Sequence, residues 1–205
     1  LNGLSNRVAN ALVEMGIGRG DKVALSCPNL PFFPIVYYGI LKAGAAVVPL
    51  NVLFKPREVA YHLQDSDAKA VFVFEGTPEL PLAKCVKEGF DQVDSCENLI
   101  VMTIDPTAPC MFDDCKTLTQ ITYDKPETFE TVATKPEDTC AILYTSGTTG
   151  QPKGAELTHL NLMTNITTTY GIHLPVLDFT DGKQKTVLIT LPLFHTTGQT
   201  VQMNT

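Results

Sequence analysis

The chain has 205 residues, of which 44% are hydrophobic, and it carries a formal net charge of −7 at pH 7. A chain of this length and composition can bury a sizeable core in one or two domains. Its basic residues are scattered, and no run of Lys and Arg is interleaved with aromatic residues, so the sequence argues against a nucleic-acid partner.

The longest apolar stretch, residues 35–54, approaches the length of a membrane span, but Lys42, Pro49 and Asn51 interrupt it. We therefore expect no transmembrane segment there, although peripheral contact with a membrane and a homodimer both stay open. Six cysteines form no C-x-x-C pair and no regular framework, and no secretory pattern opens the chain. Reduced thiols of this kind are typical of a cytoplasmic enzyme.

Apolar residues alternate between helical and strand spacing along the first half of the chain. Leu4, Val8, Leu12 and Met15 share one helical face, which predicts the first helix. The pattern that follows predicts strands and helices in turn: strand 22–27, helix 31–43, strand 46–50, helix 56–65, strand 70–74, helix 80–89 and strand 99–103. Such alternation indicates an α/β fold with mainly parallel sheets flanked by helices.

Residues 123–138 are rich in Thr, Lys, Glu and Pro without hydrophobic periodicity, and they are typical of a connector. We place a boundary within this segment, which gives a first α/β lobe at 1–130 and the start of a second lobe at 131–205. In the second lobe we expect strand 139–144, a loop, a helix over 159–170 with Thr158 as its N-cap, and strand 186–190.

The loop after strand 139–144 is the most informative segment, because residues 144–154 read YTSGTTGQPKG. Hydroxyl donors and glycine backbone N–H groups can together surround an anion, and a lysine adds a mobile positive charge. The alternative is an ordinary Ser/Thr/Gly surface loop. The segment is not a Walker loop, because Lys153 is followed by Gly154 instead of Ser or Thr, and no G-x-G-x-x-G occurs in the chain.

This string resembles the glycine-rich signature of the adenylate-forming (AMP-binding) enzymes, a superfamily that includes acyl-CoA synthetases, luciferases, aryl-CoA ligases and peptide-synthetase adenylation domains. A second segment, LPLFHTTG at 191–198, is similar to the next motif of the family and follows in the expected order. Segments 4–10, 20–24 and 41–51 also resemble the opening of acyl-CoA synthetases. The resemblance covers the whole chain and is strongest to long-chain fatty-acid CoA ligases.

The resemblance implies ATP-dependent activation of a fatty acid to acyl-AMP, followed by thioester formation with coenzyme A, and it implies Mg²⁺ as a cofactor. The residues that it implies in contact with the β and γ phosphates of ATP are Thr145, Ser146, Gly147, Thr148, Thr149, Gly150 and Lys153. It also implies Thr148 as the residue that touches Mg²⁺, with Lys153 and His195 as catalytic residues. A lone histidine such as His195 is otherwise most often structural; by resemblance it would orient the substrate carboxylate instead of moving a proton.

The chain departs from the family pattern by stopping at Thr205. The motifs for ribose and adenine, the hinge, the late catalytic lysine and the C-terminal domain of the family lie further on, so we expect an N-terminal fragment that is inactive alone. Two alternatives stay open: an aryl-CoA ligase or an acyl-AMP ligase that loads a carrier protein, and a non-catalytic nucleotide-binding module.

Overall fold

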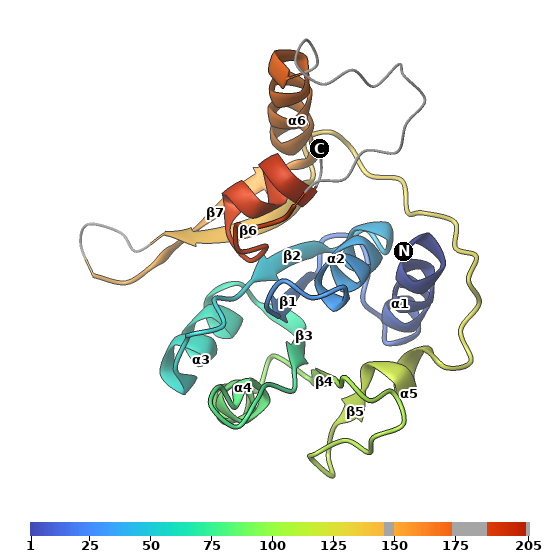
Figure 1. Cartoon of the computed structure of the whole chain (residues 1–205), viewed down its shortest axis with the longest axis vertical. Coiled ribbons are helices and arrows are strands. Elements are labelled where there is room, and N and C mark those ends of the chain that lie inside the picture. Colours follow the sequence, from blue (N-terminus) through green and yellow to red (C-terminus); the bar gives the residue numbers. More distant parts are fainter. Residues whose placement is uncertain (146–149, 174–187, 204–205) are drawn as a thin grey trace.

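Helices and strands alternate through the computed structural model, which describes residues 1–145, 150–173 and 188–203 (Figure 1). The elements are α1 (Asn2–Glu14), β1 (Lys22–Ser26), α2 (Phe32–Lys42), β2 (Ala46–Pro49), α3 (Pro56–Asp65), β3 (Ala68–Phe74), α4 (Leu82–Phe90), β4 (Asn98–Met102), β5 (Lys116–Thr117), α5 (Leu118–Thr122), β6 (Thr139–Thr145), β7 (Lys153–Thr158), α6 (His159–His173) and the π-helix η1 (Gly198–Met203). Every element predicted before residue 105 is present, with ends that differ by one or two residues.

The described strands form one seven-stranded sheet in the order β5-β4-β3-β1-β2-β6-β7. All neighbours pair in parallel except β6 and β7, which pair antiparallel. The predicted fold class, mainly parallel sheet flanked by helices, is therefore confirmed. Helices α1 and α2 lie on one side of the strands, and α3 and α4 lie on the other (Figure 1).

Burial on both faces explains why the central strands have almost no polar residues. Every residue of β2 is buried, and Val47 lies between Val23 of β1 and Ala141 of β6. Parallel strands that are covered by helices on both sides read as continuous apolar runs. The largest fully buried side chains, which include Phe33, Tyr37 and Phe72, come from the same strands and helices.

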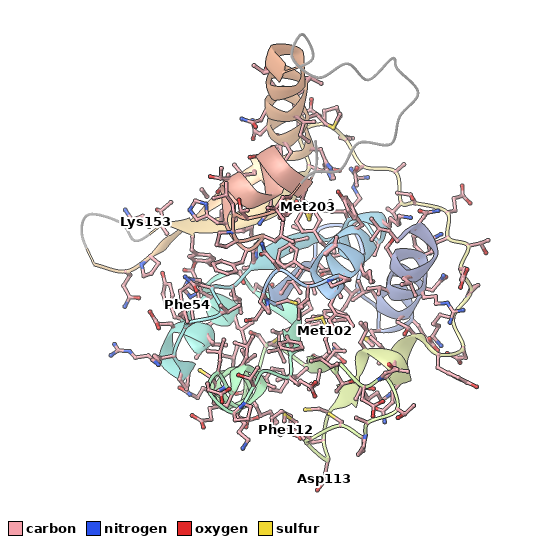
Figure 2. The ribbon with its side chains drawn as sticks, viewed as in Figure 1. Phe54, Met102, Phe112, Asp113, Lys153 and Met203 are labelled. Carbon is pink, nitrogen blue, oxygen red and sulfur yellow. The ribbon has the colours of Figure 1, made fainter. Side chains whose placement is uncertain are left out.

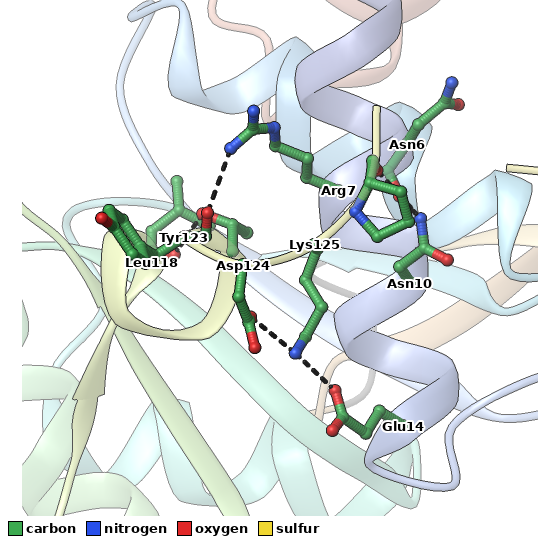
Figure 3. Close-up of polar contacts among 10 residues, drawn as sticks. Asn6, Arg7, Asn10, Glu14, Leu118, Tyr123, Asp124 and Lys125 are labelled. Atoms are coloured by element: carbon green, nitrogen blue, oxygen red, sulfur yellow. Dashed lines mark hydrogen bonds and ion pairs between the residues drawn. The ribbon is translucent and has the colours of Figure 1, made fainter. Parts of the chain in front are cut away.

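The predicted connector lies along α1 instead of crossing open space (Figure 3). Asn6 and Asn10, one helical turn apart, donate side-chain hydrogen bonds to the backbone carbonyls of Glu127 (2.6 Å) and Thr128 (3.0 Å). Lys125 forms an ion pair with Glu14 at the end of the same helix at 2.8 Å. These contacts hold the first part of the connector, residues 125–128, against α1, and the backbone N–H of Val132 donates to the carbonyl of Lys42 before the chain rejoins the sheet beside β2.

The segment around the glycine-rich loop differs from the prediction of strand, loop and helix. The chain returns from the loop as strand β7, and α6 begins only at His159. Thr158 caps this helix as predicted, because its hydroxyl accepts from the N–H of Asn161 at 3.2 Å. In the predicted strand 186–190, residues 188–190 are not strand, and the remainder lies outside the described residues.

Candidate functional site

A cavity of about 530 Å³ lies where the parallel strands β2 and β6 end. Its walls come from Pro49 at the end of β2, Asn51 just beyond it, the last residues of β6, helix α3, and the segment 194–196. Because β2 and β6 run in parallel, their carboxyl ends meet at one edge of the sheet. Ligands of open parallel sheets bind at this edge.

The described ends of the glycine-rich loop lie beside this cavity. Thr145, the last residue of β6, lines the cavity and pairs with Lys153, the first residue of β7. Figure 2 shows Lys153 at the loop end of the hairpin, where its side chain is exposed. Gly150 has a φ of +123°, a backbone conformation that side chains rarely adopt. Ser146, Gly147, Thr148 and Thr149 lie outside the described residues.

His195 lines the same cavity, although it is distant from Thr145 in the sequence. Its Nδ1 accepts from the backbone N–H of Thr197 at 3.4 Å, so the neutral ring carries its proton on Nε2. A protonated Nε2 can donate to a carboxylate oxygen. The structure thus brings together two of the predicted site segments, which line a single cavity.

Asn29, after β1, fixes the histidine segment to the sheet. Its amide nitrogen donates to the carbonyl of Leu191 and its amide oxygen accepts from the N–H of Leu193, each at 2.9 Å. The side chain therefore acts as a two-point clamp on backbone groups more than 160 residues away. The sequence alone does not indicate a role for Asn29, because nothing in the local pattern pairs it with the distant segment.

Side-chain oxygens of residues that line the cavity are of the type that Mg²⁺ prefers. Thr145 contributes a hydroxyl, Asn51 an amide oxygen and Glu58 a carboxylate. Within residues 1–145, 150–173 and 188–203, no group of three His, Cys, Asp or Glu residues could hold a metal ion by itself. Oxygen groups of this kind fit a Mg²⁺ ion, which proteins usually hold through one or two side chains together with substrate phosphates.

His62 is a further cavity residue that the sequence did not single out. Its side chain is only 1% exposed, and its ring packs between Phe54 and Tyr144, with centroids 4.4 and 4.2 Å away. Nδ1 lies 2.6 Å from the carbonyl oxygen of Glu58, which orients the ring. On sequence alone His62 is one polar residue on an amphipathic helix, and only the contacts made by the fold reveal its burial.

Burial lowers the pKa of His62 below its usual value of 6.5, against the raising effects of the Glu58 carbonyl and of the Glu58 and Asp65 carboxylates. Below pH 6.5 the unfolded chain therefore binds a proton before the folded chain does. We expect the free energy of unfolding to be highest above pH 6.5 and to fall with decreasing pH, by at most about 1.4 kcal/mol per pH unit from this group.

Urea unfolding between pH 5 and pH 8 measures this contribution. His62→Phe keeps an aromatic ring between Phe54 and Tyr144 but removes the titrating group. The variant should lose part of the decline in stability at acid pH. His159, whose pKa is also lowered by burial, accounts for some of the remaining decline. If the free energy of unfolding falls equally steeply with decreasing pH in the parent and in His62→Phe, then His62 does not contribute to the decline.

No helix in the described part of the chain is long and apolar enough to cross a membrane.

This chain is similar to proteins of a known enzyme family. The family model described as AMP-binding enzyme matches residues 1–205. A long-chain-fatty-acid–CoA ligase of Escherichia coli O6:H1 is 33% identical over 219 residues, which cover 96% of this chain and 37% of that protein. The long-chain-fatty-acid–CoA ligase FadD13 of Mycobacterium tuberculosis is 32% identical over 200 residues, which cover 98% and 36%. The chain thus spans little more than a third of the length of these relatives.

Solved structures share the fold. A crystal structure of the anthranilate CoA ligase AuaEII in complex with anthranoyl-AMP matches 82% of this chain and 31% of that chain, with a TM-score of 0.71 and 28% identity. A long-chain-fatty-acid-CoA ligase, FadD1 from Archaeoglobus fulgidus, matches 98% of this chain and 36% of that chain, with a TM-score of 0.77 and 24% identity. The second likeness supports the fold alone.

Proposed function

The chain belongs to the AMP-binding enzyme family, and we propose that it forms the N-terminal third of a ligase that activates a long-chain fatty acid with ATP and then transfers the acyl group to coenzyme A. One observation carries the proposal: the ends of the glycine-rich loop and His195 lie at a single cavity, at the carboxyl edge of β2 and β6. An adenylation site has to bring a polyphosphate and a carboxylate together in such a place.

The loop and the histidine take different roles in this proposal. The loop would hold the β and γ phosphates of ATP through Thr145, Ser146, Gly147, Thr148, Thr149, Gly150 and Lys153, and Thr148 would be the residue that contacts Mg²⁺. His195 orients the carboxylate through its Nε2 proton. Bound Mg²⁺ would supply positive charge against the phosphate oxygens. The lobes at 1–130 and 131–205 are part of the same proposal, and the 205-residue chain alone does not complete adenylation.

The chemistry needs alignment more than proton transfer. Fatty acids titrate near pH ~4 to 5, so the carboxylate is ionised at neutral pH and attacks without a general base. A carboxylate oxygen forms a bond to the α-phosphorus while the bond from that phosphorus to the bridging oxygen breaks, and pyrophosphate leaves with the electron pair. The thiolate sulfur of coenzyme A then attacks the acyl carbon and AMP departs. Positive charge beside the departing pyrophosphate therefore contributes most to the first step.

The choice of a fatty acid rests on the relatives, because the named curated relatives are long-chain-fatty-acid–CoA ligases. An aryl-CoA ligase is the second candidate, since the anthranilate CoA ligase AuaEII is similar in both fold and sequence. An acyl-AMP ligase that loads a carrier protein, and a non-catalytic nucleotide-binding module, share the same loop. The cavity alone does not separate these candidates.

Exchange of labelled pyrophosphate into ATP by the full-length protein distinguishes the four candidate functions. We expect exchange that depends on a long-chain fatty acid and needs no coenzyme A, with thioester product only when coenzyme A is added. Higher exchange with benzoate or anthranilate would favour the aryl-CoA ligase. Acyl-AMP that accumulates unchanged in the presence of coenzyme A would favour carrier loading, and no exchange with any acid would contradict an enzymatic role.

A further inference from the structure

Helix α3 contacts both ends of the glycine-rich loop through hydroxyl groups. At the first end, the hydroxyl of Tyr144, next to Thr145, donates to Oδ2 of Asp65 at 2.6 Å. At the second end, the hydroxyl of Tyr61 donates to the backbone carbonyl of Pro152, next to Lys153, at 2.7 Å. Tyr61 and Asp65 are four residues apart and lie on one face of α3. One helical face thus holds the two points from which the loop departs.

The proton of each hydroxyl has a defined acceptor. The Tyr61 hydroxyl also lies 3.5 Å from Oδ1 of Asp65, but it carries one proton, which goes to the closer carbonyl of Pro152. Burial raises the pKa of Tyr144 above its usual range, and the Asp65 carboxylate raises it further. The Tyr144 hydroxyl therefore remains a donor at neutral pH, and its bond to a carboxylate is of the stronger, charge-assisted kind.

The rings that carry these hydroxyls are packed in place. Tyr144 lies edge-on to both His62 and Tyr61, with centroid distances of 4.2 and 6.3 Å. Across the hairpin, Tyr144 pairs with Gly154. A Cβ on Gly154 would lie 3.2 Å from Cζ of Tyr144 and 2.8 Å from Cγ2 of Ile142. The glycine of the motif therefore leaves room for the Tyr144 ring, and it belongs to β7 instead of the loop.

We propose that Tyr61, Asp65 and Tyr144 form a clamp, two hydrogen bonds from α3 that fix the ends of the loop, and that they act as positioning residues for pyrophosphate binding. The proposal rests on the proposed function, since the loop is the part that would hold the phosphates. Tyr144 itself lines the cavity, whereas Tyr61 and Asp65 are not among its lining residues, so these two act only through the ends of the loop. Fixing both ends of a loop reduces the conformational freedom that it loses on binding a ligand, which raises affinity.

Single-atom variants of the full-length protein test the clamp. Tyr144→Phe and Tyr61→Phe each remove one hydroxyl and leave the packed ring. We expect each to raise the KM for ATP, and the Kd for inorganic pyrophosphate with Mg²⁺ measured by calorimetry, about tenfold. The KM for the fatty acid should change less than about twofold, because the hydroxyls contact the loop and not the histidine segment.

Variants of Asp65 test whether this residue and Tyr144 act through the same hydrogen bond, and whether a second acceptor at position 65 restores the affinity for pyrophosphate. Asp65→Ala should match Tyr144→Phe, and the double variant should be no weaker than either single one, because both changes remove the same bond. Asp65→Asn keeps an acceptor oxygen and should restore most of the affinity. Tyr123→Phe serves as a matched control, since Tyr123 is 82% exposed and directly follows α5, next to β5 at the opposite edge of the sheet from the β6–β7 hairpin.

The outcomes separate the clamp from the proposed function. In one outcome, the parent protein shows fatty-acid-dependent pyrophosphate exchange while both Phe variants bind pyrophosphate as tightly as the parent does. This result would overturn the clamp and leave the proposed function standing. Equal losses for ATP and fatty acid, with a lowered melting temperature, would also overturn it, because they indicate a general structural role. Parent protein without exchange and without pyrophosphate binding would overturn both.

Discussion

Replacing Lys153 with alanine is expected to lower kcat/KM for ATP in pyrophosphate exchange about 100-fold, the usual effect of removing one group that stabilises transition-state charge. Lys153 is the first residue of β7 and lies opposite Thr145 at the base of the loop. Its side chain is exposed, so the substitution opens no cavity in the core. Under the proposed function, the variant loses the positive charge of Lys153 beside the departing pyrophosphate. Steady-state exchange kinetics on the full-length protein measure it.

Lys116→Ala is the matched control for this prediction. Lys116 is likewise an exposed lysine at the start of a strand, but β5 lies at the opposite edge of the sheet from β7. The control should keep the exchange rate of the parent. If Lys153→Ala exchanges pyrophosphate as fast as Lys116→Ala, then Lys153 has no part in phosphate binding and the assignment of the loop is wrong.

A methyl group at Gly198 is expected to lower kcat/KM for the fatty acid about 100-fold, because a displacement near 1 Å at a reacting group can have this effect. A Cβ at Gly198 would clash with the carbonyl oxygen of Pro192. The same oxygen accepts from the backbone N–H of His195 at 3.0 Å. The clash therefore has to move the segment that places the His195 ring at the cavity. Overpacking should also lower stability by about 1–3 kcal/mol.

Gly18→Ala controls for the effect of adding a methyl group. Its Cβ would meet only the carbonyl oxygen of Ala43, at an ordinary 3.7 Å. Both variants should be compared by melting temperature and by separate KM values for ATP and the fatty acid. Gly198→Ala protein that folds and turns over the fatty acid as the parent does would show that the position of His195 is unimportant for the reaction.

The sequence predicts most of the sheet, because its strands and helices carry their own periodic signals. Strand β2 is four apolar or proline residues that are all buried, and α3 begins with proline and a glutamate whose carboxylate accepts from the N–H of Lys55. Strand β7 is missed for the opposite reason. Its first four residues are exposed at the edge of the sheet, so no alternation of apolar and polar residues marks them, and pairing with β6 alone makes them a strand.

The candidate site is predictable only in part, because its segments meet through tertiary contacts. The loop and His195 stand out by their residue types, whereas Asn29, His62 and Asp65 gain their roles from partners far along the chain. Asp65 reads as an ordinary helix-end carboxylate until Tyr144, 79 residues later, donates to it. Contacts of this kind depend on the order of strands in the sheet, which local spacing does not encode.

A crystal structure of the full-length protein with an acyl-adenylate analogue and pyrophosphate bound tests the proposed adenylation site most directly. We expect the pyrophosphate to contact Thr145 and Lys153 at the two ends of the loop. The carboxyl-derived oxygen of the acyl group should lie within hydrogen-bond distance of His195, inside the cavity at the ends of β2 and β6. A nucleotide bound elsewhere, with this cavity empty, would contradict the assignment of the site.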